Sequence, residues 1–145
     1  MIDIMGGWFE ILQWRTPMSK RVEKPWGYEE IWARTDQYVG KIIRIWAGHR
    51  LSLQYHREKE ETIRVLEGQL QLHHQPDESE DRINITQLEP GDSYHIRPGI
   101  KHRFEAATDD VLLVEVSTTQ LEDVVRLEDD YGRGGADSPR ARDNY

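Results

Sequence analysis

A period-two alternation of apolar and polar residues from Trp26 to Ser117 limits the fold more than any other feature of this sequence. Segments rich in Ile, Val, Tyr and Trp are separated by Gly, Pro and Asp, and no long amphipathic helix interrupts them. The pattern predicts nine short strands, at residues 28–33, 38–46, 51–56, 62–66, 69–74, 82–88, 93–96, 102–105 and 111–116. Short strands at this spacing are typical of an all-β, antiparallel double-sheet sandwich or barrel.

A length of 145 residues is enough for one domain and leaves no room for a second core. We expect the barrel to occupy residues 22–133, after an N-terminal arm at 1–21 and before a flexible tail at 134–145. The acidic segment 75–81 is predicted to form a mobile hairpin tip. Residues 120–131 fit either a short helix or one more strand.

Charge and composition exclude several classes of function. The formal charge of −8 disfavours nucleic acid as a partner, although a local basic pocket for a small phosphorylated ligand remains compatible with it. The sequence has no Cys, which excludes disulfides, Cys-ligated metal sites and thiol catalysis. No apolar run is long enough for a membrane span, and the N-terminus lacks the pattern of a signal peptide, so we expect a cytoplasmic protein.

Strand parity gathers side chains that could hold a metal ion. Gln54 and His56 share one face of a predicted strand, Glu61 begins a second strand with an apolar face, and His102 begins a third beside Phe104. Two imidazoles, a carboxylate and an amide at one place would suit a divalent cation. The alternative is that each His is an ordinary hydrogen-bonded residue at a strand end, as we expect for His49, His73, His74 and His95.

The spacing of these residues resembles the two sequence motifs of the cupin superfamily. The first motif is matched by Gly48, Gln54, His56, Glu61 and Gly68, with Gln in place of the usual first His. The second is matched by Gly91, Gly99 and His102, but it departs from the usual pattern at Arg97 and Ala106. The resemblance implies the cupin form of the antiparallel barrel, of jelly-roll type.

A closer resemblance, over residues 22–133, is to the C-terminal domain of type II mannose-6-phosphate isomerases. Four segments carry it: Lys24–Glu29, Arg50–His56, Pro98–Arg103 and Glu122–Arg133. In that family the cupin is often fused behind a guanylyltransferase domain, which this sequence lacks, so nucleotidyl transfer is not expected. Residues 57–60 and 62–63 depart from the family pattern beside the site, which leaves the identity of the sugar open.

This resemblance implies a divalent metal held by Gln54, His56, Glu61 and His102, with Zn²⁺ as first choice and Mn²⁺, Fe²⁺ or Ni²⁺ also suited to such ligands. It implies isomerisation of a hexose 6-phosphate, with mannose 6-phosphate giving fructose 6-phosphate. We expect Arg50, Lys59 and Arg103 to bind the sugar phosphate. Lys59 and Glu60 are the candidates for catalytic proton transfer because they lie closest in sequence to the ligands.

Two other functions remain open from the sequence. A two-His-one-carboxylate set is also the ligand type of Fe(II) oxygenases, although Gln54 as a fourth ligand would occupy a position that oxygen needs. A metal-bound cupin could also bind a sugar or sugar phosphate without turning it over. Whichever of the three functions is correct, we expect a homodimer. The five Trp give more aromatic surface than a small core needs, and edge strands are exposed unless they are paired or covered.

Overall fold

The computed structural model describes residues 19–133. Most of the predicted arm, with Trp8 and Trp14, and all of the predicted tail lie outside these residues. The strands are β1 (Lys20–Lys24), β2 (Gly27–Arg34), β3 (Val39–Ile45), β4 (His49–Arg50), β5 (Leu53–Tyr55), β6 (Glu61–Glu67), β7 (Leu70–His74), β8 (Asn84–Leu88), β9 (Ser93–Ile96), β10 (His102–Ala106), β11 (Val111–Ser117) and β12 (Val125–Glu128). Within residues 19–133 there is no helix long and apolar enough to cross a membrane.

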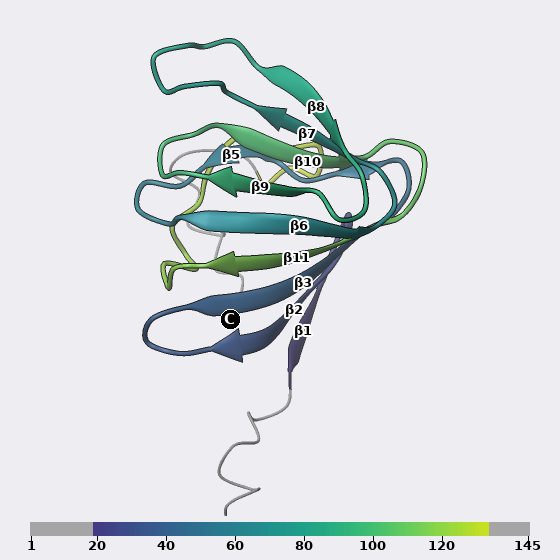
Figure 1. Ribbon diagram of the computed structural model, residues 1–145, viewed down its shortest axis with the longest axis vertical. Coiled ribbons are helices and arrows are strands. Elements are labelled where there is room, and N and C mark those ends of the chain that lie inside the picture. Colours follow the sequence, from purple (N-terminus) through teal and green to yellow (C-terminus); the bar gives the residue numbers. More distant parts are fainter. Residues whose placement is uncertain (1–18, 134–145) are drawn as a thin grey trace, which may run out of the picture.

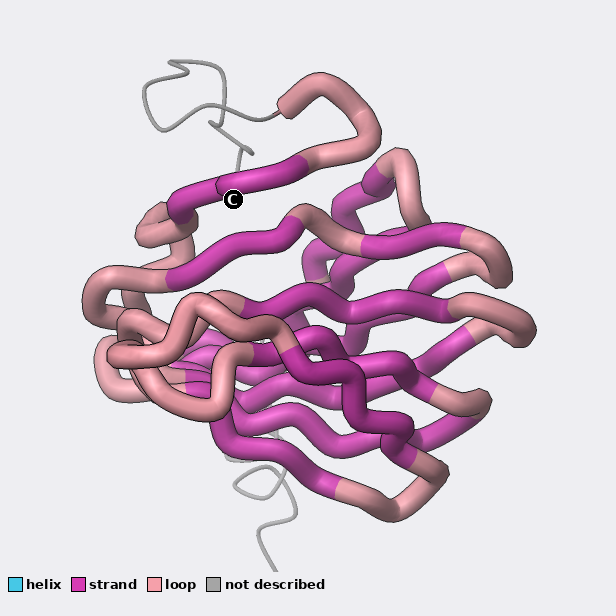
Figure 2. The backbone as a smooth tube through the Cα atoms, turned by 90° about the horizontal axis from the view of Figure 1, so that it is seen from above, coloured by secondary structure: helices cyan, strands magenta, loops and turns pink. Residues whose placement is uncertain are grey.

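Two antiparallel sheets form the fold (Figure 1). One has the strand order β1-β2-β3-β11-β6-β9, and the other has the order β12-β5-β10-β7-β8 with β4 paired to β10. Seen from above, the strands curve around a common interior and the loops gather at the two ends (Figure 2). The predicted all-β double-sheet barrel is therefore confirmed.

Each of the nine predicted strands overlaps an observed strand, and three observed strands were not predicted as such. β1 begins at Lys20, inside the predicted arm, because this segment pairs along its whole length with β2. β4 is only two residues long and pairs with β10. β12 decides between the two possibilities for residues 120–131, since it adds a strand to the edge of the second sheet beside β5.

The inward face of the first sheet is apolar at one end and charged at the other. On β3, Ile43 and Ile45 are buried in the core, whereas Lys41 lies two residues earlier on the same face. On β11, Leu113 is buried in the core, and Glu115 follows on the same face. The apolar end closes the barrel, and the charged end contains the cavity described below.

Two glycines occupy positions that other residues would not fit. Gly27 follows the turn between β1 and β2, and a Cβ atom there would lie 1.9 Å from the carbonyl oxygen of Arg44. Gly68 has φ of +76°, and a Cβ atom there would lie 2.2 Å from the carbonyl oxygen of Asp110. Both positions therefore allow the close backbone approach that the sheet requires.

Candidate metal centre

Three side chains from different strands meet inside the barrel. His56 follows β5, Glu61 is the first residue of β6, and His102 is the first residue of β10. One ligand atom from each lies within 4.8 Å of the others, and all three residues are buried. We call these residues the metal triad.

The two imidazoles are held so that their Nε2 atoms face the carboxylate. Nδ1 of His56 bonds the carbonyl oxygen of Asp123, and Nδ1 of His102 lies 2.9 Å from the carbonyl oxygen of Ile100. A carbonyl oxygen only accepts, so each Nδ1 carries a proton, and in the neutral form of each ring Nε2 is left with a lone pair.

Those lone pairs are directed at carboxylate oxygens. Nε2 of His56 lies 3.6 Å from Oε2 of Glu61, and Nε2 of His102 lies 3.1 Å from Oε1 of the same residue. Both Nε2 atoms are buried, and the described residues supply neither with a hydrogen-bond partner. Two ligands about 2.1 Å from a tetrahedral ion lie roughly 3.4 Å apart, so the triad has the spacing that a bound divalent cation would require.

The protonation states also suit a cation. Burial lowers the pKa of His56 to about 4, so its ring is neutral at pH 7. Burial alone would raise the pKa of Glu61, but the charge of Lys59 and the contacts with the two imidazoles outweigh it, and the pKa lies well below the usual range. A neutral imidazole and an ionised carboxylate are the forms that bind metals.

Asp123 fixes the loop between two members of the triad. Besides the contact of its carbonyl with His56, its carboxylate accepts hydrogen bonds from the amides of Arg57 at 3.1 Å, Glu58 at 2.6 Å and Lys59 at 2.9 Å. One residue therefore orients an imidazole and holds the chain that leads to Glu61. Outer partners of this kind set the orientation of metal ligands.

A line of buried charges extends from the triad across the first sheet. Nζ of Lys59 contacts Glu61 and lies 2.9 Å from Glu115, and Nζ of Lys41 lies 3.3 Å from Glu29. Lys41 and Glu115 are directly opposite each other on β3 and β11. We call these five residues the charge row; their signs alternate in the order Glu29, Lys41, Glu115, Lys59 and Glu61, which lie in β2, β3, β11, the loop before β6, and β6.

Sequence reasoning missed three members of the charge row. Glu29, Lys41 and Glu115 occupy strand positions whose parity places them inward, next to apolar residues. Charges at inward positions of three strands were the signal that could have found them, because such charges are seldom buried unless they are paired.

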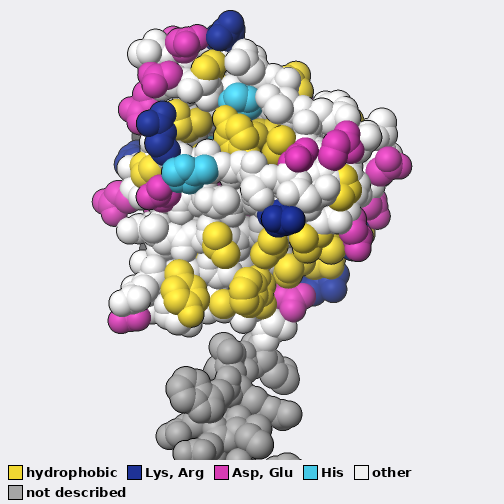
Figure 3. All heavy atoms as spheres, viewed as in Figure 1, with side chains coloured by type: hydrophobic (Ala, Val, Ile, Leu, Met, Phe, Trp, Pro, Cys, Tyr) yellow, Lys and Arg dark blue, Asp and Glu magenta, His cyan; other side chains and the backbone are white. Residues whose placement is uncertain are grey.

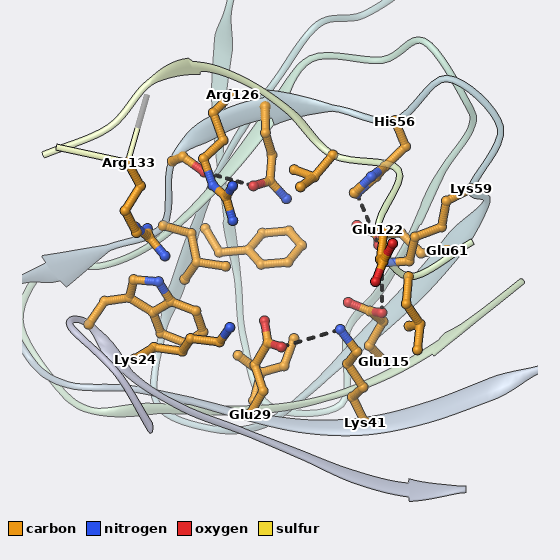
Figure 4. Close-up of a pocket in the computed structure, with 18 residues that line it drawn as sticks. Lys24, Glu29, Lys41, His56, Lys59, Glu61, Glu115, Glu122, Arg126 and Arg133 are labelled. Atoms are coloured by element: carbon orange, nitrogen blue, oxygen red, sulfur yellow. Dashed lines mark hydrogen bonds and ion pairs between the residues drawn. The ribbon is translucent and has the colours of Figure 1, made fainter. Parts of the chain in front are cut away.

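Two members of the triad, His56 and Glu61, line one side of a cavity (Figure 4), and a different set of residues lines the other. Lys24, Arg126 and Arg133 direct their side chains into this opposite side, and we call them the cation cluster. Gln54 also lines the cavity, and its Oε1 accepts a 2.7 Å hydrogen bond from Ser52. Gln54 is also the register partner of His102, which places it on the strand next to the triad. Its assignment as a fourth metal ligand stays a prediction.

Of the predicted substrate-binding and catalytic residues, Lys59 lines the cavity and the others do not. Arg50 bonds Asp130 at 2.7 Å, and Arg103 donates to the carbonyl of Leu51 at 3.0 Å; neither arginine is among the residues that line the cavity. Arg103 alternates with His102 along β10 and so points to the opposite face. Glu60 is exposed beside His95, with which it forms a 2.7 Å ion pair.

The other histidines of the described chain are engaged in ordinary contacts. His73 lies 2.6 Å from Glu105, and His49 contacts the carbonyl of Ala47. His74 is buried and lies 2.9 Å from both Thr86 and Tyr94. These roles agree with the expected solvated or packing roles.

Comparison with known proteins identifies a family for most of this barrel. A family model described as Cupin domain matches residues 41–117. No curated protein matches the chain.

Solved structures share the fold at low sequence identity. KdgF from Halomonas sp. superposes with a TM-score of 0.61 at 16% identity, covering 72% of this chain and 91% of that one. The capsular polysaccharide assembling protein CapF from Staphylococcus aureus gives 0.68 at 16% identity, over 78% of this chain and 35% of that one. Oxalate decarboxylase from Bacillus subtilis gives 0.65 at 16% identity, over 75% and 30%. The chain thus spans about a third of the latter two proteins.

Proposed function

The chain belongs to the cupin family, and from this premise we propose that it is a metal-dependent aldose–ketose isomerase acting on a hexose 6-phosphate. Mannose 6-phosphate and fructose 6-phosphate are the first pair to test, because four segments of the sequence resemble type II mannose-6-phosphate isomerases. The observation that carries the proposal is the metal triad, in which two buried Nε2 atoms without a hydrogen-bond partner among the described residues face one carboxylate, and of which His56 and Glu61 line a cavity.

Aldose–ketose isomerisation needs a proton moved between adjacent carbons and a stabilised enediolate oxygen. C2 of the aldose loses a proton to a base, C1 gains one, and the hydroxyl proton passes from O2 to O1. A bound divalent cation would supply Lewis-acid polarisation of the carbonyl in this site. His56, Glu61 and His102 would hold that cation, and Gln54 is the predicted fourth ligand.

Lys59 serves this chemistry as a fixed positive charge. Burial lowers its pKa, but Glu115 and Glu61 raise it by more, so the net pKa lies above the ordinary value and the ammonium stays protonated at neutral pH. A protonated Lys59 stabilises negative charge developing near Glu61 and does not act as the base.

Glu122 is the candidate proton carrier in place of Glu60. It lines the cavity, whereas Glu60 pairs with His95 on the exposed surface. Figure 4 labels Glu122, with Lys59 and Glu61, among the residues that line the cavity. An exposed carboxylate at a cavity wall can exchange protons with both substrate and solvent.

The test is proton exchange at C2 of mannose 6-phosphate. The purified full chain is loaded separately with Zn²⁺, Mn²⁺, Fe²⁺ or Ni²⁺ and followed by proton NMR in D₂O. We expect loss of the C2 proton signal and formation of fructose 6-phosphate with at least one metal, and no activity in His102→Ala. Binding of mannose 6-phosphate without exchange under every metal would contradict the isomerase and favour a binding protein.

A further inference from the structure

We propose that the cation cluster, Lys24, Arg126 and Arg133, is a phosphate subsite that holds the anionic end of the sugar opposite the metal triad. This inference rests on the proposed function and specifies how its substrate is recognised. It also replaces Arg50 and Arg103, which the structure keeps out of the cavity, as the phosphate-binding residues.

The cluster lies across the cavity from His56 and Glu61 (Figure 4). Lys24 ends β1, Arg126 is in β12, and Arg133 follows β12, so three separate positions direct cations to one wall. Arg126 is the register partner of Gln54, which places it on the strand next to the predicted fourth ligand. A ligand that spans the cavity would therefore meet the triad at one end and the cluster at the other.

The charges of the cavity favour an anion at this wall. Lys41 and Lys59, which also line the cavity, form ion pairs with Glu29, Glu61 and Glu115. The three cations of the cluster line the other side, where Arg133 also pairs with Asp129 of its own turn, within a chain whose overall charge is −8. A local concentration of guanidinium groups in an acidic protein is the arrangement that selects a phosphate, because guanidinium and phosphate match in charge and geometry.

The turn after β12 is built to present Arg133. Nη2 of Arg133 lies 2.7 Å from Oδ1 of Asp129, whose Oδ2 also accepts the amide of Arg133 at 2.6 Å and that of Tyr131 at 3.2 Å. Gly132 has φ of +74°, which lets the chain reverse between these contacts. The guanidinium is thus oriented before a ligand arrives, which reduces the entropy lost on binding.

Arg50 contributes to the subsite as a positioning residue. Its Nε and Nη2 donate to the two carboxylate oxygens of Asp130 at 2.7 and 3.1 Å, and Arg50 is not among the residues that line the cavity. Asp130 follows Asp129 directly and belongs to the same turn as Arg133. Because Arg50 is in β4, its two hydrogen bonds to Asp130 fix this turn to β4. Arg50 therefore acts on a phosphate through Arg133.

Calorimetric titration of the metal-loaded full chain tests the subsite directly. The ligands are mannose 6-phosphate, mannose and inorganic phosphate, and the variants are Arg126→Gln and Arg133→Gln. We expect each variant to bind mannose 6-phosphate roughly 10- to 100-fold more weakly, to bind inorganic phosphate more weakly, and to keep its affinity for mannose. Arg133→Lys should recover part of the loss. Metal content, measured on the same samples, should not change.

Arg64→Gln is the matched control, because Arg64 is exposed on β6 and does not line the cavity. Arg50→Gln should weaken mannose 6-phosphate binding in the wild-type background and have no further effect in Arg133→Gln. An equal effect of Arg50→Gln in both backgrounds would contradict its positioning role.

The outcomes separate the subsite from the reaction. Unchanged affinity for mannose 6-phosphate in both Arg126→Gln and Arg133→Gln overturns the subsite. The same result is expected if the phosphate binds the metal instead of the arginines. The subsite is then overturned even if the protein is an active isomerase. Absence of phosphate and mannose 6-phosphate binding by the wild type overturns it as well. Arginine-dependent binding without proton exchange supports the subsite and contradicts the isomerase.

Discussion

Nε2 of His102 lies 3.1 Å from Oε1 of Glu61, although neither atom carries a proton in the neutral form of the ring, in which Nδ1 donates to the carbonyl oxygen of Ile100. Two acceptors at this distance repel each other unless a cation or a proton lies between them. The same relationship holds at 3.6 Å between Nε2 of His56 and Oε2 of Glu61. A divalent cation would satisfy both contacts at once.

Removal of a triad side chain should therefore remove the metal. We expect His102→Ala and Glu61→Gln each to weaken metal binding by more than about tenfold, since even outer partners of metal ligands cost this much. Elemental analysis after dialysis against a limiting metal buffer measures the effect. His95→Ala, at an exposed histidine paired with Glu60, should keep the wild-type content. Equal metal content in all three variants would contradict the assignment.

The metal-free protein should lose stability as the pH falls below neutrality. The folded pKa of His56 is about 4 against an ordinary value of 6.5, so between these values the unfolded chain binds more protons than the folded one. The contribution of His56 to the free energy of unfolding is fully present above pH 6.5 and is lost as the pH falls through 4, a decline of about 3 kcal/mol. Urea denaturation at pH 7.5 and 4.5 measures the change. The decline should be smaller in His56→Ala and unaltered in His95→Ala; an equal decline in His56→Ala would assign it to other groups.

Lys59→Met should destabilise the fold strongly. The change leaves the carboxylates of Glu61 and Glu115 buried without the cation that contacts both, and breaking a buried ion pair on one side costs about 3–5 kcal/mol. The free energy of unfolding from urea titration checks the value. Adding Glu115→Gln should recover part of the loss, because one uncompensated charge is removed. Lys101→Met, which breaks a pair with the exposed Asp81, should have little effect.

The predicted homodimer has a candidate contact surface on the outer face of the first sheet. Trp32, Tyr38 and Val116 are 45%, 53% and 49% exposed there, and the Trp32 ring lies over Gly40, the register partner of Val116. Figure 3 shows hydrophobic side chains gathered over this part of the molecule. We expect Trp32→Glu to shift light scattering from dimer to monomer mass at micromolar concentration. A wild type of monomer mass would contradict the prediction.

The sequence predicted the barrel well because a period of two is a local property of each strand. Ile43 and Ile45, for example, are inward because of their parity alone. β1 was missed as a strand, and the segment of β12 was left open between a strand and a helix, because edge strands with many charges, such as Lys20–Lys24, show no alternation of hydrophobicity. Their pairing with β2 and β5 depends on contacts that no local pattern reveals.

The candidate site could be predicted in part. His56, Glu61 and His102 were found because each stands at the end of a strand with a readable face. Proximity in sequence did not place Glu60 or Arg103 in the cavity, since Glu60 precedes β6 and contacts His95, and Arg103 alternates with His102 along β10. Arg126 and Arg133 could not be assigned to the cavity, because their approach depends on how the last strand joins the second sheet.

The charge row has a consequence for how this sequence can diverge. Each of Glu29, Lys41, Glu115, Lys59 and Glu61 is neutralised by a neighbour of opposite sign on the same or an adjacent strand. A single replacement leaves a buried charge uncompensated, whereas a joint replacement of two neighbours by apolar residues of similar volume does not. Evolutionary paths through these positions are therefore epistatic, and homologous barrels that have lost one member should have lost its partner as well.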